Sequence, residues 1–389
     1  MVKTKAPLLL AYVALVSSCA PGAPSASART QILELARGRL GRTVSLERAG
    51  ASLVAVYSNW ETTSLYAAEL PLSDRLPDAP PPPRLIDKID TTLPLSPTFG
   101  EHVSLGRGSD VSVLYLAREG EDKLVLKLAS HAAGSSDWTL DVIEPPGSPV
   151  ALLPSDSGRT EIMWATDALL GMTYPGSLPA VSMLSPFLPA DRASVVRSGG
   201  DDEPDRPAGA DLAAFPRRPG ARGFTVYDAV SHGLLYFRWN GAAYAQTRVE
   251  GAGPVHSSVL LRDGALAVFS WDERTKRLSL VRVPADGSPV ARSVVSLSEG
   301  TTAVSLLAKG SRLFFLYDEI RRMGGNRVLY ELSLLVPGQG VQTGPGRLRR
   351  IVLASSDQPL SDFSALVASD ELFVLLLQGS LKLMRLSLP

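Results

Sequence analysis

The hydrophobic residues of this chain gather in short runs that are separated by polar turns. Some runs alternate apolar and polar residues, as in a strand with one face in water, whereas others are continuously apolar, as in a strand buried on both faces. Asp263-Gly264 and Asp286-Gly287 lie between such runs, where hairpins need turns of this kind. The clearest set of four predicted strands comprises residues 256–261, 265–271, 278–283 and 290–297.

The same four-strand unit recurs along the chain. The next copy comprises residues 303–307, 312–317, 328–335 and 348–353. Four less regular copies begin near residues 43, 102, 150 and 224. A last copy has only three predicted strands, at residues 364–368, 372–377 and 381–386. Seven such units are typical of an all-β, seven-bladed β-propeller with four-stranded blades. Six or eight blades, or a pair of β-sandwich domains, are the alternatives.

The incomplete last unit needs a fourth strand, because a closed ring leaves no blade with a missing outer strand. The segment 31–36 (Gln-Ile-Leu-Glu-Leu-Ala) precedes the first unit and is a candidate for that strand. Its residue types also favour a helix, and Ile32, Leu33 and Leu35 do not alternate strictly. Strand and helix therefore both stay open for this segment.

The N-terminus has the composition of an export signal. Lys3 and Lys5 precede an apolar stretch, residues 6–16, which is shorter than the ~20 residues that a membrane-spanning helix needs. Val16-Ser17-Ser18-Cys19 resembles the lipobox of bacterial lipoproteins, and Cys19 is the only cysteine of the chain. The resemblance implies that residues 1–18 are a cleaved signal peptide and that Cys19 carries lipid. A plain secretory signal with an incidental cysteine is the alternative.

The same resemblance implies a cellular location and a domain organisation. Residue 20 is Ala rather than Asp, which in the lipoprotein sorting pattern favours the outer membrane of the bacterial cell envelope. Residues 19–29 are then the lipidated cysteine and a tether rich in small residues, and residues 30–389 form the propeller domain. The membrane, reached through lipid on Cys19, is the first expected partner.

Charge and cysteine content limit the other partners. Lys and Arg total 39, and Asp and Glu also total 39, so loss of Lys3 and Lys5 with the signal peptide leaves a net charge of about −2. A near-neutral chain has no general attraction to nucleic acid, and nucleic acid is not an expected partner. With Cys19 as its only cysteine, the chain cannot form internal disulfides.

The sequence holds no nucleophile elbow, phosphate-binding loop or metal-ligand motif, so we predict no cofactor, no metal and no catalytic residue. His102 and His256 both fall at the start of predicted innermost strands, beside the central channel of a propeller. With Asp362 or Arg42 at equivalent positions, they form a candidate ligand-binding site at the channel mouth. The competing interpretation is that both histidines are ordinary surface or turn residues.

Two further hypotheses concern loops and strand ends. The acidic loop at residues 201–205 would offer oxygen ligands to Ca²⁺, or is simply a solvated loop. Four aromatic residues at strand ends would form a binding rim if exposed, or pack between blades if buried: Tyr57, Trp60, Trp271 and Tyr317.

Because propellers host enzymes and binding platforms alike, the fold does not decide the function. The anchor, the repeat and the lack of catalytic motifs favour a non-enzymatic, membrane-anchored binding or scaffold module for a protein or an envelope polymer. The alternative is a carbohydrate-active hydrolase or lyase, which would need converging carboxylates at the channel mouth.

Overall fold

A computed structural model describes the protein from residue 30 onwards, with gaps. The described residues are 30–89, 101–119, 123–131, 135, 137–154, 159–166, 168–174, 182–185, 189–198, 223–228, 232–261, 263–284, 289–297, 299–309, 312–323, 327–337, 348–368 and 370–388. All secondary-structure elements in these ranges are β-strands. The same ranges hold no helix that is long and apolar enough to cross a membrane.

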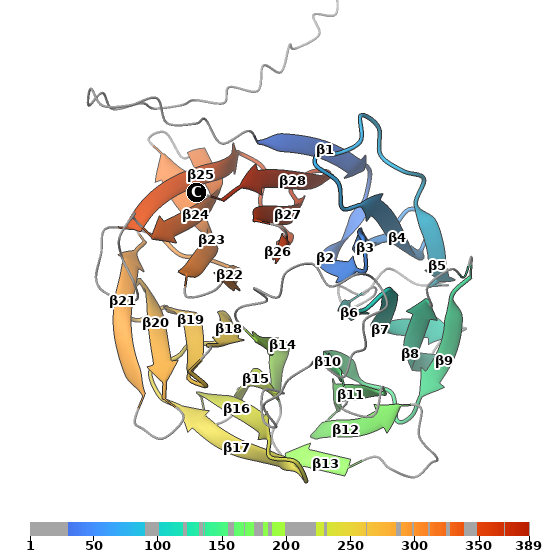
Figure 1. Cartoon of the computed structure of the whole chain (residues 1–389), viewed down its shortest axis with the longest axis horizontal. Coiled ribbons are helices and arrows are strands. Elements are labelled where there is room, and N and C mark those ends of the chain that lie inside the picture. The colour runs from blue at the N-terminus through green and yellow to red at the C-terminus, as the bar shows by residue number, and fades with distance from the viewer. Residues whose placement is uncertain are drawn as a thin grey trace, which may run out of the picture.

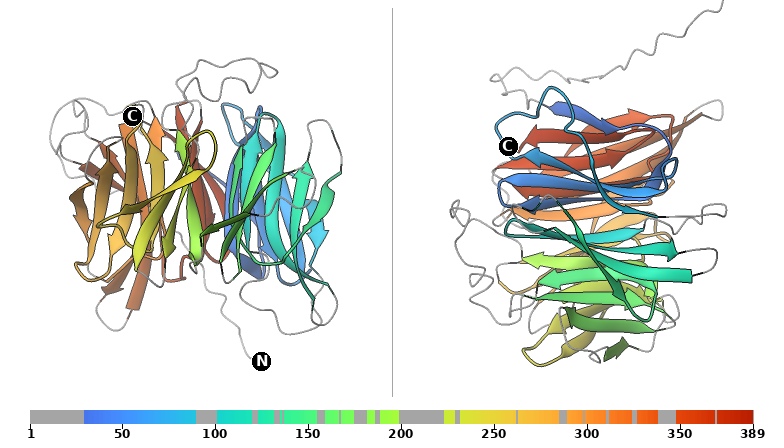
Figure 2. Two further views of the ribbon diagram at one scale, coloured as in Figure 1. Left: turned by 90° about the horizontal axis from the view of Figure 1, so that it is seen from below. Right: turned by 90° about the vertical axis from the view of Figure 1, so that its right-hand side faces the viewer.

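The strands form seven four-stranded blades around a central axis, as the prediction of a seven-bladed β-propeller required (Figure 1). Within each blade, neighbouring strands pair antiparallel. In two side views the ring of blades has the shape of a thick disc, and the strands run between its two faces (Figure 2). The innermost strands of all seven blades contact their neighbours in a closed circuit, which excludes two separate sandwiches.

The first four blades are complete in chain order, from the innermost strand outwards. Blade 1 contains β2 (Leu40–Ala49), β3 (Ser52–Asn59), β4 (Ser64–Pro71) and β5 (Arg84–Lys88). Blade 2 contains β6 (His102–Arg107), β7 (Asp110–Glu119), β8 (Lys123–His131) and β9 (Thr139–Ile143). Blade 3 contains β10 (Ser148–Pro154), β11 (Thr160–Ala165), β12 (Leu169–Tyr174) and β13 (Ser182–Ser185). Blade 4 contains β14 (Pro189–Ser198), β15 (Gly223–Asp228), β16 (Gly233–Trp239) and β17 (Tyr244–Val249).

The last three blades include the two units that were clearest in the sequence. Blade 5 contains β18 (His256–Leu260), β19 (Leu266–Asp272), β20 (Arg277–Val283) and β21 (Val290–Ser296). Blade 6 contains β22 (Val304–Lys309), β23 (Arg312–Met323), β24 (Arg327–Pro337) and β25 (Leu348–Ser356). Blade 7 contains β26 (Asp362–Ala368), β27 (Glu371–Leu377), β28 (Leu381–Ser387) and β1 (Gln31–Ala36).

Blade 7 confirms the strand interpretation of residues 31–36. β1 pairs antiparallel with β28, with Gln31 opposite Arg385, and supplies the outer strand that the C-terminal part of the chain lacks. Leu33 and Leu35 are buried between blades 7 and 1, while Ile32 is 58% exposed. The break in alternation at Ile32 is therefore an exposed apolar side chain on an otherwise alternating strand.

The hydrophobic core is divided into seven clusters, one at each junction between neighbouring blades. β3 shows why its sequence is continuously apolar. Leu53 and Tyr57 face blade 7, whereas Val54 and Val56 face blade 2. A strand with another blade on each side has no solvent face, so the central positions 53–57 of β3 are all apolar.

Blades 4 and 5 are joined more closely than the other pairs. Their innermost strands, β14 and β18, pair in parallel at Arg197 with Val259 and Ser198 with Leu260, so the two blades form one continuous sheet. The division into seven blades persists, because each half of that sheet keeps four antiparallel strands in blade order.

Candidate functional site

His102 and His256 occupy the positions predicted for them. Each is the first residue of an innermost strand, β6 in blade 2 and β18 in blade 5. All innermost strands begin at the same face of the ring, here called the upper face, so both histidines lie near that face. Blades 2 and 5 are three steps apart around a ring of seven, however, and the fold does not place the two histidines in adjacent blades.

The contacts of His256 link two blades. Its Nδ1 lies 2.8 Å from the carbonyl oxygen of Pro254, and its Nε2 lies 3.4 Å from the carbonyl oxygen of Thr225 in blade 4. Burial lowers the pKa of His256 below its usual value, and the two carbonyl groups offset part of that effect. The imidazole is therefore neutral near pH 7, and its contacts connect blade 5 to blade 4. Its ligand-binding role stays a prediction.

The other residues of the candidate ligand-binding site differ in their exposure to solvent. His102 is only 4% exposed and lies opposite Tyr115. Asp362 begins β26, the position equivalent to the histidines, and is 3% exposed. Arg42 lies within an irregular stretch of β2 and is exposed. Of this set, only Arg42 offers an exposed charged group at the upper face.

Polar side chains near the axis bond to the backbone of the next blade. Asp362 Oδ2 accepts a 2.8 Å hydrogen bond from the Val44 N–H, which joins blade 7 to blade 1. Glu47 Oε2 accepts one of 3.2 Å from the Gly106 N–H, which joins blade 1 to blade 2. These two bonds satisfy N–H groups on the inner edges of blades 1 and 2. Two serines do the same for other backbone groups, Ser364 for Leu46 and Ser257 for Leu306.

Blade 1 also carries buried polar atoms that have no hydrogen-bond partner among the described residues. They are the hydroxyl oxygens of Thr43, Ser45 and Ser58 and the indole nitrogen of Trp60. A Cβ atom at Gly41 would lie 1.8 Å from Ser58 Oγ, so this hydroxyl packs directly on the glycine. Ordered water is the usual partner of such atoms.

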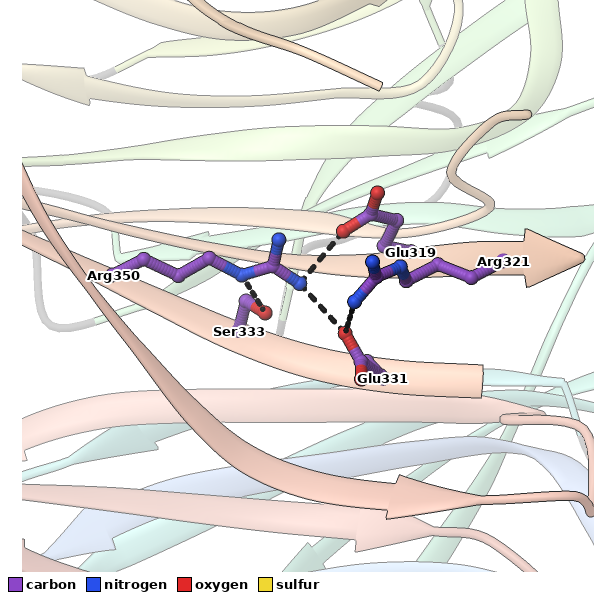
Figure 3. Close-up of polar contacts among 5 residues, drawn as sticks. All are labelled: Glu319, Arg321, Glu331, Ser333 and Arg350. Atoms are coloured by element: carbon purple, nitrogen blue, oxygen red, sulfur yellow. Dashed lines mark hydrogen bonds and ion pairs between the residues drawn. The ribbon is translucent and has the colours of Figure 1, made fainter. Parts of the chain in front are cut away.

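The most concentrated charged cluster lies in blade 6 (Figure 3). β23 and β24 place Glu319 and Glu331 directly opposite each other, a pairing of like charges that is destabilising by itself. Arg350 on β25 bridges them, with its Nη2 2.7 Å from Glu319 Oε2 and 2.8 Å from Glu331 Oε2. Both carboxylates are therefore bridged by one guanidinium, which connects three strands.

Further contacts hold the two arginines of this cluster in place. Arg350 Nε donates a 3.0 Å hydrogen bond to Ser333 Oγ, and its guanidinium lies over the ring of Tyr317, 5.8 Å from the centroid. Arg321 Nη1 donates a 3.2 Å bond to Glu331 Oε2, and this carboxylate raises the pKa of Arg321. Burial raises the pKa of Tyr317, which keeps its phenol neutral.

Exposure in this cluster differs by charge. The Glu319 and Glu331 side chains are 7% and 9% exposed, whereas Arg350 and Arg321 are 33% and 44% exposed. Solvent or a partner therefore meets guanidinium groups, with the acids beneath them. The two acids lie on the second and third strands of blade 6 and are bound by arginine, so they are not the free carboxylates at the channel mouth that a glycosidase would need.

Sequence reasoning missed this cluster, although a signal for it exists. Tyr317, Glu319 and Arg321 are spaced by two on β23, as are Glu331 and Ser333 on β24, which places each set on one strand face. Their pairing depends on the register between the strands, which the sequence pattern does not state.

The hypothesis that four aromatic residues form an exposed rim is wrong for three of them. Tyr57, Trp271 and Tyr317 are 3%, 5% and 0% exposed and pack in the clusters between blades. The ends of second strands are covered on both sides by neighbouring blades, so aromatic residues there fill the junctions. Trp60 is partly buried.

Two sequence hypotheses lie outside the described residues. One is the lipidation of Cys19 after a signal peptide of residues 1–18 and before a tether of residues 19–29, and the other is the acidic loop at residues 201–205. Within the described residues, no group of three or more His, Cys, Asp or Glu side chains is arranged to hold a metal ion.

No known protein family matches this sequence, and no curated protein matches it. Among solved structures, "YCF48 bound to D1 peptide" is similar over 92% of this chain and 96% of that chain, with 13% identity and a TM-score of 0.52. A prolyl endopeptidase structure is similar over 87% of this chain and 47% of that chain, with 14% identity and a TM-score of 0.48. The structure of a GH43_1 enzyme from Xanthomonas citri is similar over 82% of this chain and 91% of that chain, with 10% identity and a TM-score of 0.35. At these identities the likeness shows the propeller fold alone.

Proposed function

We propose that this protein is a lipid-anchored, non-enzymatic binding module of the bacterial cell envelope, which recognises a protein or an envelope polymer. The observation that carries the proposal is the use of polar side chains near the axis. Asp362, Glu47, Ser257 and Ser364 bond to the backbone of adjacent blades, and the imidazole nitrogens of His256 face carbonyl groups. Groups engaged in this way support a rigid scaffold, in which loops and blade edges carry recognition.

Two further points support the proposal. The lipobox-like sequence ending at Cys19 would keep the domain at a membrane surface, where lipid chains contribute about 0.8 kcal/mol per buried methylene. A solved propeller of similar fold is described as bound to a peptide, which is an example of this scaffold acting as a receptor.

The anchor is tested first, by metabolic labelling with palmitate and by membrane fractionation. The wild-type chain should carry label and sediment with the outer membrane, while Cys19→Ala should carry none and leave the membrane fraction. An unlabelled wild-type chain in the soluble fraction would contradict the anchor and the envelope address.

The binding role is tested by recovery of the lipidated protein from solubilised envelopes, with Cys19→Ala as the control and mass spectrometry as the readout. A specific protein recovered only with the anchored form supports a binding module. Recovery of glycan alone, followed by its cleavage on incubation with the purified chain, would favour the hydrolase or lyase instead.

A further inference from the structure

β25 differs from the outer strands of the other six blades in length. It has nine residues, whereas the others have four to seven among the described residues. It lies at the end of its sheet and pairs only with β24 among the described strands. A long edge strand presents a row of backbone N–H and C=O groups that can pair with another extended chain.

The side chains of this edge combine positive charge with apolar surface. Arg349 and Arg350 are exposed on β25, which contains no acidic residue. Leu348 and Val352 on the same strand are 37% and 47% exposed. Arginine with exposed aliphatic surface is the composition that protein interfaces favour, and it fits an extended segment that carries both carboxylates and apolar side chains.

Positive charge continues along blade 6 to the tip of the β23–β24 hairpin. Arg321, Arg322 and Arg327 lie there, next to Met323, which is 49% exposed. With Arg349 and Arg350 this makes five arginines, against the three glutamates that pair with some of them, Glu299, Glu319 and Glu331. Arg327, at the hairpin tip, and Arg349, at the opposite end of the blade, have no ion-pair partner among the described residues, so positive charge is available to a ligand at both ends of this edge.

The buried part of the Arg350 cluster makes the edge rigid before a ligand arrives. Glu319 on β23 and Glu331 and Ser333 on β24 hold the Arg350 guanidinium, and through it β25. The extended β23 strand is itself held by its bridge to Gly300 and by Asp318, which accepts bonds from Thr301 and from the Ala303 N–H. An edge ordered in advance costs little entropy on binding.

We propose that β25 is a docking edge for an extended acidic segment of a protein partner, which adds to blade 6 as a fifth strand. The backbone of the segment pairs with the outer edge of β25. Leu348, Arg350 and Val352 face one side of the blade and Arg349 faces the other, so the segment carries carboxylates and apolar side chains on both of its faces. Its end extends past β25 towards Arg321 and Arg327 at the hairpin tip. This inference rests on the proposed binding function and names the chemistry of its partner.

The test uses the full-length lipidated chain in detergent and labelled ten-residue peptides, with fluorescence anisotropy as the readout. A peptide of Glu-Glu-Val-Val repeats, which carries Glu and Val on both strand faces, should bind, and its Gln-for-Glu counterpart should bind at least about tenfold more weakly. The double variant Arg327→Gln, Arg349→Gln should weaken the acidic peptide about tenfold. The matched control Arg274→Gln, Arg277→Gln removes the same charge from an exposed turn of blade 5 and should bind like the wild type.

Strand addition is separated from simple charge attraction by methylating the backbone nitrogens of the acidic peptide. A strand uses alternate N–H groups at each of its two edges, so methylation of either the odd or the even positions should abolish binding, while the other set should preserve it. Equal binding of both methylated peptides would overturn strand addition. Binding to phosphatidylglycerol vesicles without binding to the peptide, or self-association lost in the double variant, would replace the peptide by a membrane or by a second copy.

Failure of this inference is distinguishable from failure of the proposed function. If the lipidated wild-type chain and the double variant recover the same protein from envelopes, the binding function stands and β25 is not the docking edge. If the wild-type chain recovers no protein at all, the binding function itself fails.

Discussion

Blades 2 and 6 each bury a tyrosine in the upper part of the second strand and surround it with charges, yet the two networks connect different parts. Tyr115 in blade 2 is fully buried, and its hydroxyl donates a 2.7 Å hydrogen bond to Asp87 on the outer strand of blade 1. Lys127 lies 3.0 Å from the same carboxylate. The Asp87 and Lys127 side chains are 13% and 12% exposed, so the centre of this network is shielded from solvent and joins two blades, and only Glu119, which also pairs with Lys127, is 46% exposed.

The network beside Tyr317 in blade 6 draws its acids and its two arginines from three strands of one blade. Arg321 and Arg350 remain 44% and 33% exposed. The charged residues around equivalent tyrosines therefore have different roles in the two blades. A network covered by the next blade contributes to packing, whereas one that extends past its neighbours leaves cations available for a partner.

Replacing Arg350 by Met should have the largest effect on stability. The change leaves Glu319 and Glu331 buried opposite each other, and we expect it to lower the free energy of unfolding by about 3 kcal/mol at pH 7. Urea unfolding measures the effect, with Arg349→Met as the control, because Arg349 is an exposed neighbour without an ion pair among the described residues. Equal stability of the two variants would show that Arg350 does not neutralise the pair.

Lys127→Met should have a smaller effect, about 2 kcal/mol, because Tyr115 still donates to Asp87 and the other carboxylate that Lys127 pairs with, that of Glu119, is 46% exposed. Lys123→Met on the same strand is the matched control, since Lys123 is exposed. A larger loss for Lys127→Met than for Arg350→Met in urea unfolding would reverse the order that we infer for the two networks.

A still smaller effect should come from His256, which lies outside both networks. Burial lowers its pKa, so the unfolded chain takes up a proton near pH 6.5 while the folded chain does not. Stability is then complete above about pH 6.5 and falls as the pH drops from there towards the lowered pKa of the folded state. Unfolding measured from pH 8 to pH 5 should show a shallower decline for His256→Gln. An identical decline in both proteins would mean that other groups cause it.

The smallest effect is expected for the double variant Arg327→Gln, Arg349→Gln. Both arginines are exposed and lack ion pairs among the described residues, so the free energy of unfolding should change by less than about 0.5 kcal/mol. The variant should nevertheless bind the acidic peptide about tenfold more weakly. A marked loss of stability would place these arginines in the packing of blade 6 instead.

The repeat was predictable because each blade repeats the same local pattern of apolar runs and turns. The Asp263-Gly264 turn illustrates this: Gly264 has a φ of 82°, a conformation that glycine adopts readily, and the turn connects the first two strands of blade 5 as expected. The starts of most innermost strands were also predictable, which placed His102, His256 and Asp362 at equivalent positions. Blade 4 is the exception: its unit was expected to begin near residue 224, whereas its innermost strand is β14, which begins at Pro189.

The candidate site was less predictable, because it depends on contacts between residues far apart in the sequence. The sequence shows Glu319, Glu331 and Arg350 only as charges on three separate runs, and strand register brings them together. Likewise, Tyr57, Trp271 and Tyr317 stand next to polar turns, and only the neighbouring blades show that they are covered.

The sequence by itself determined the strand class and the need for a closing strand and favoured seven repeats over six or eight, because periodicity and turn chemistry act over a few neighbouring residues. It left β1 open between helix and strand, and pairing with β28 decided for the strand by burying Leu33 and Leu35. Tertiary structure alone decided which charged side chains are buried between blades and which remain exposed to solvent at β25, because solvent exposure is set by the packing of whole blades.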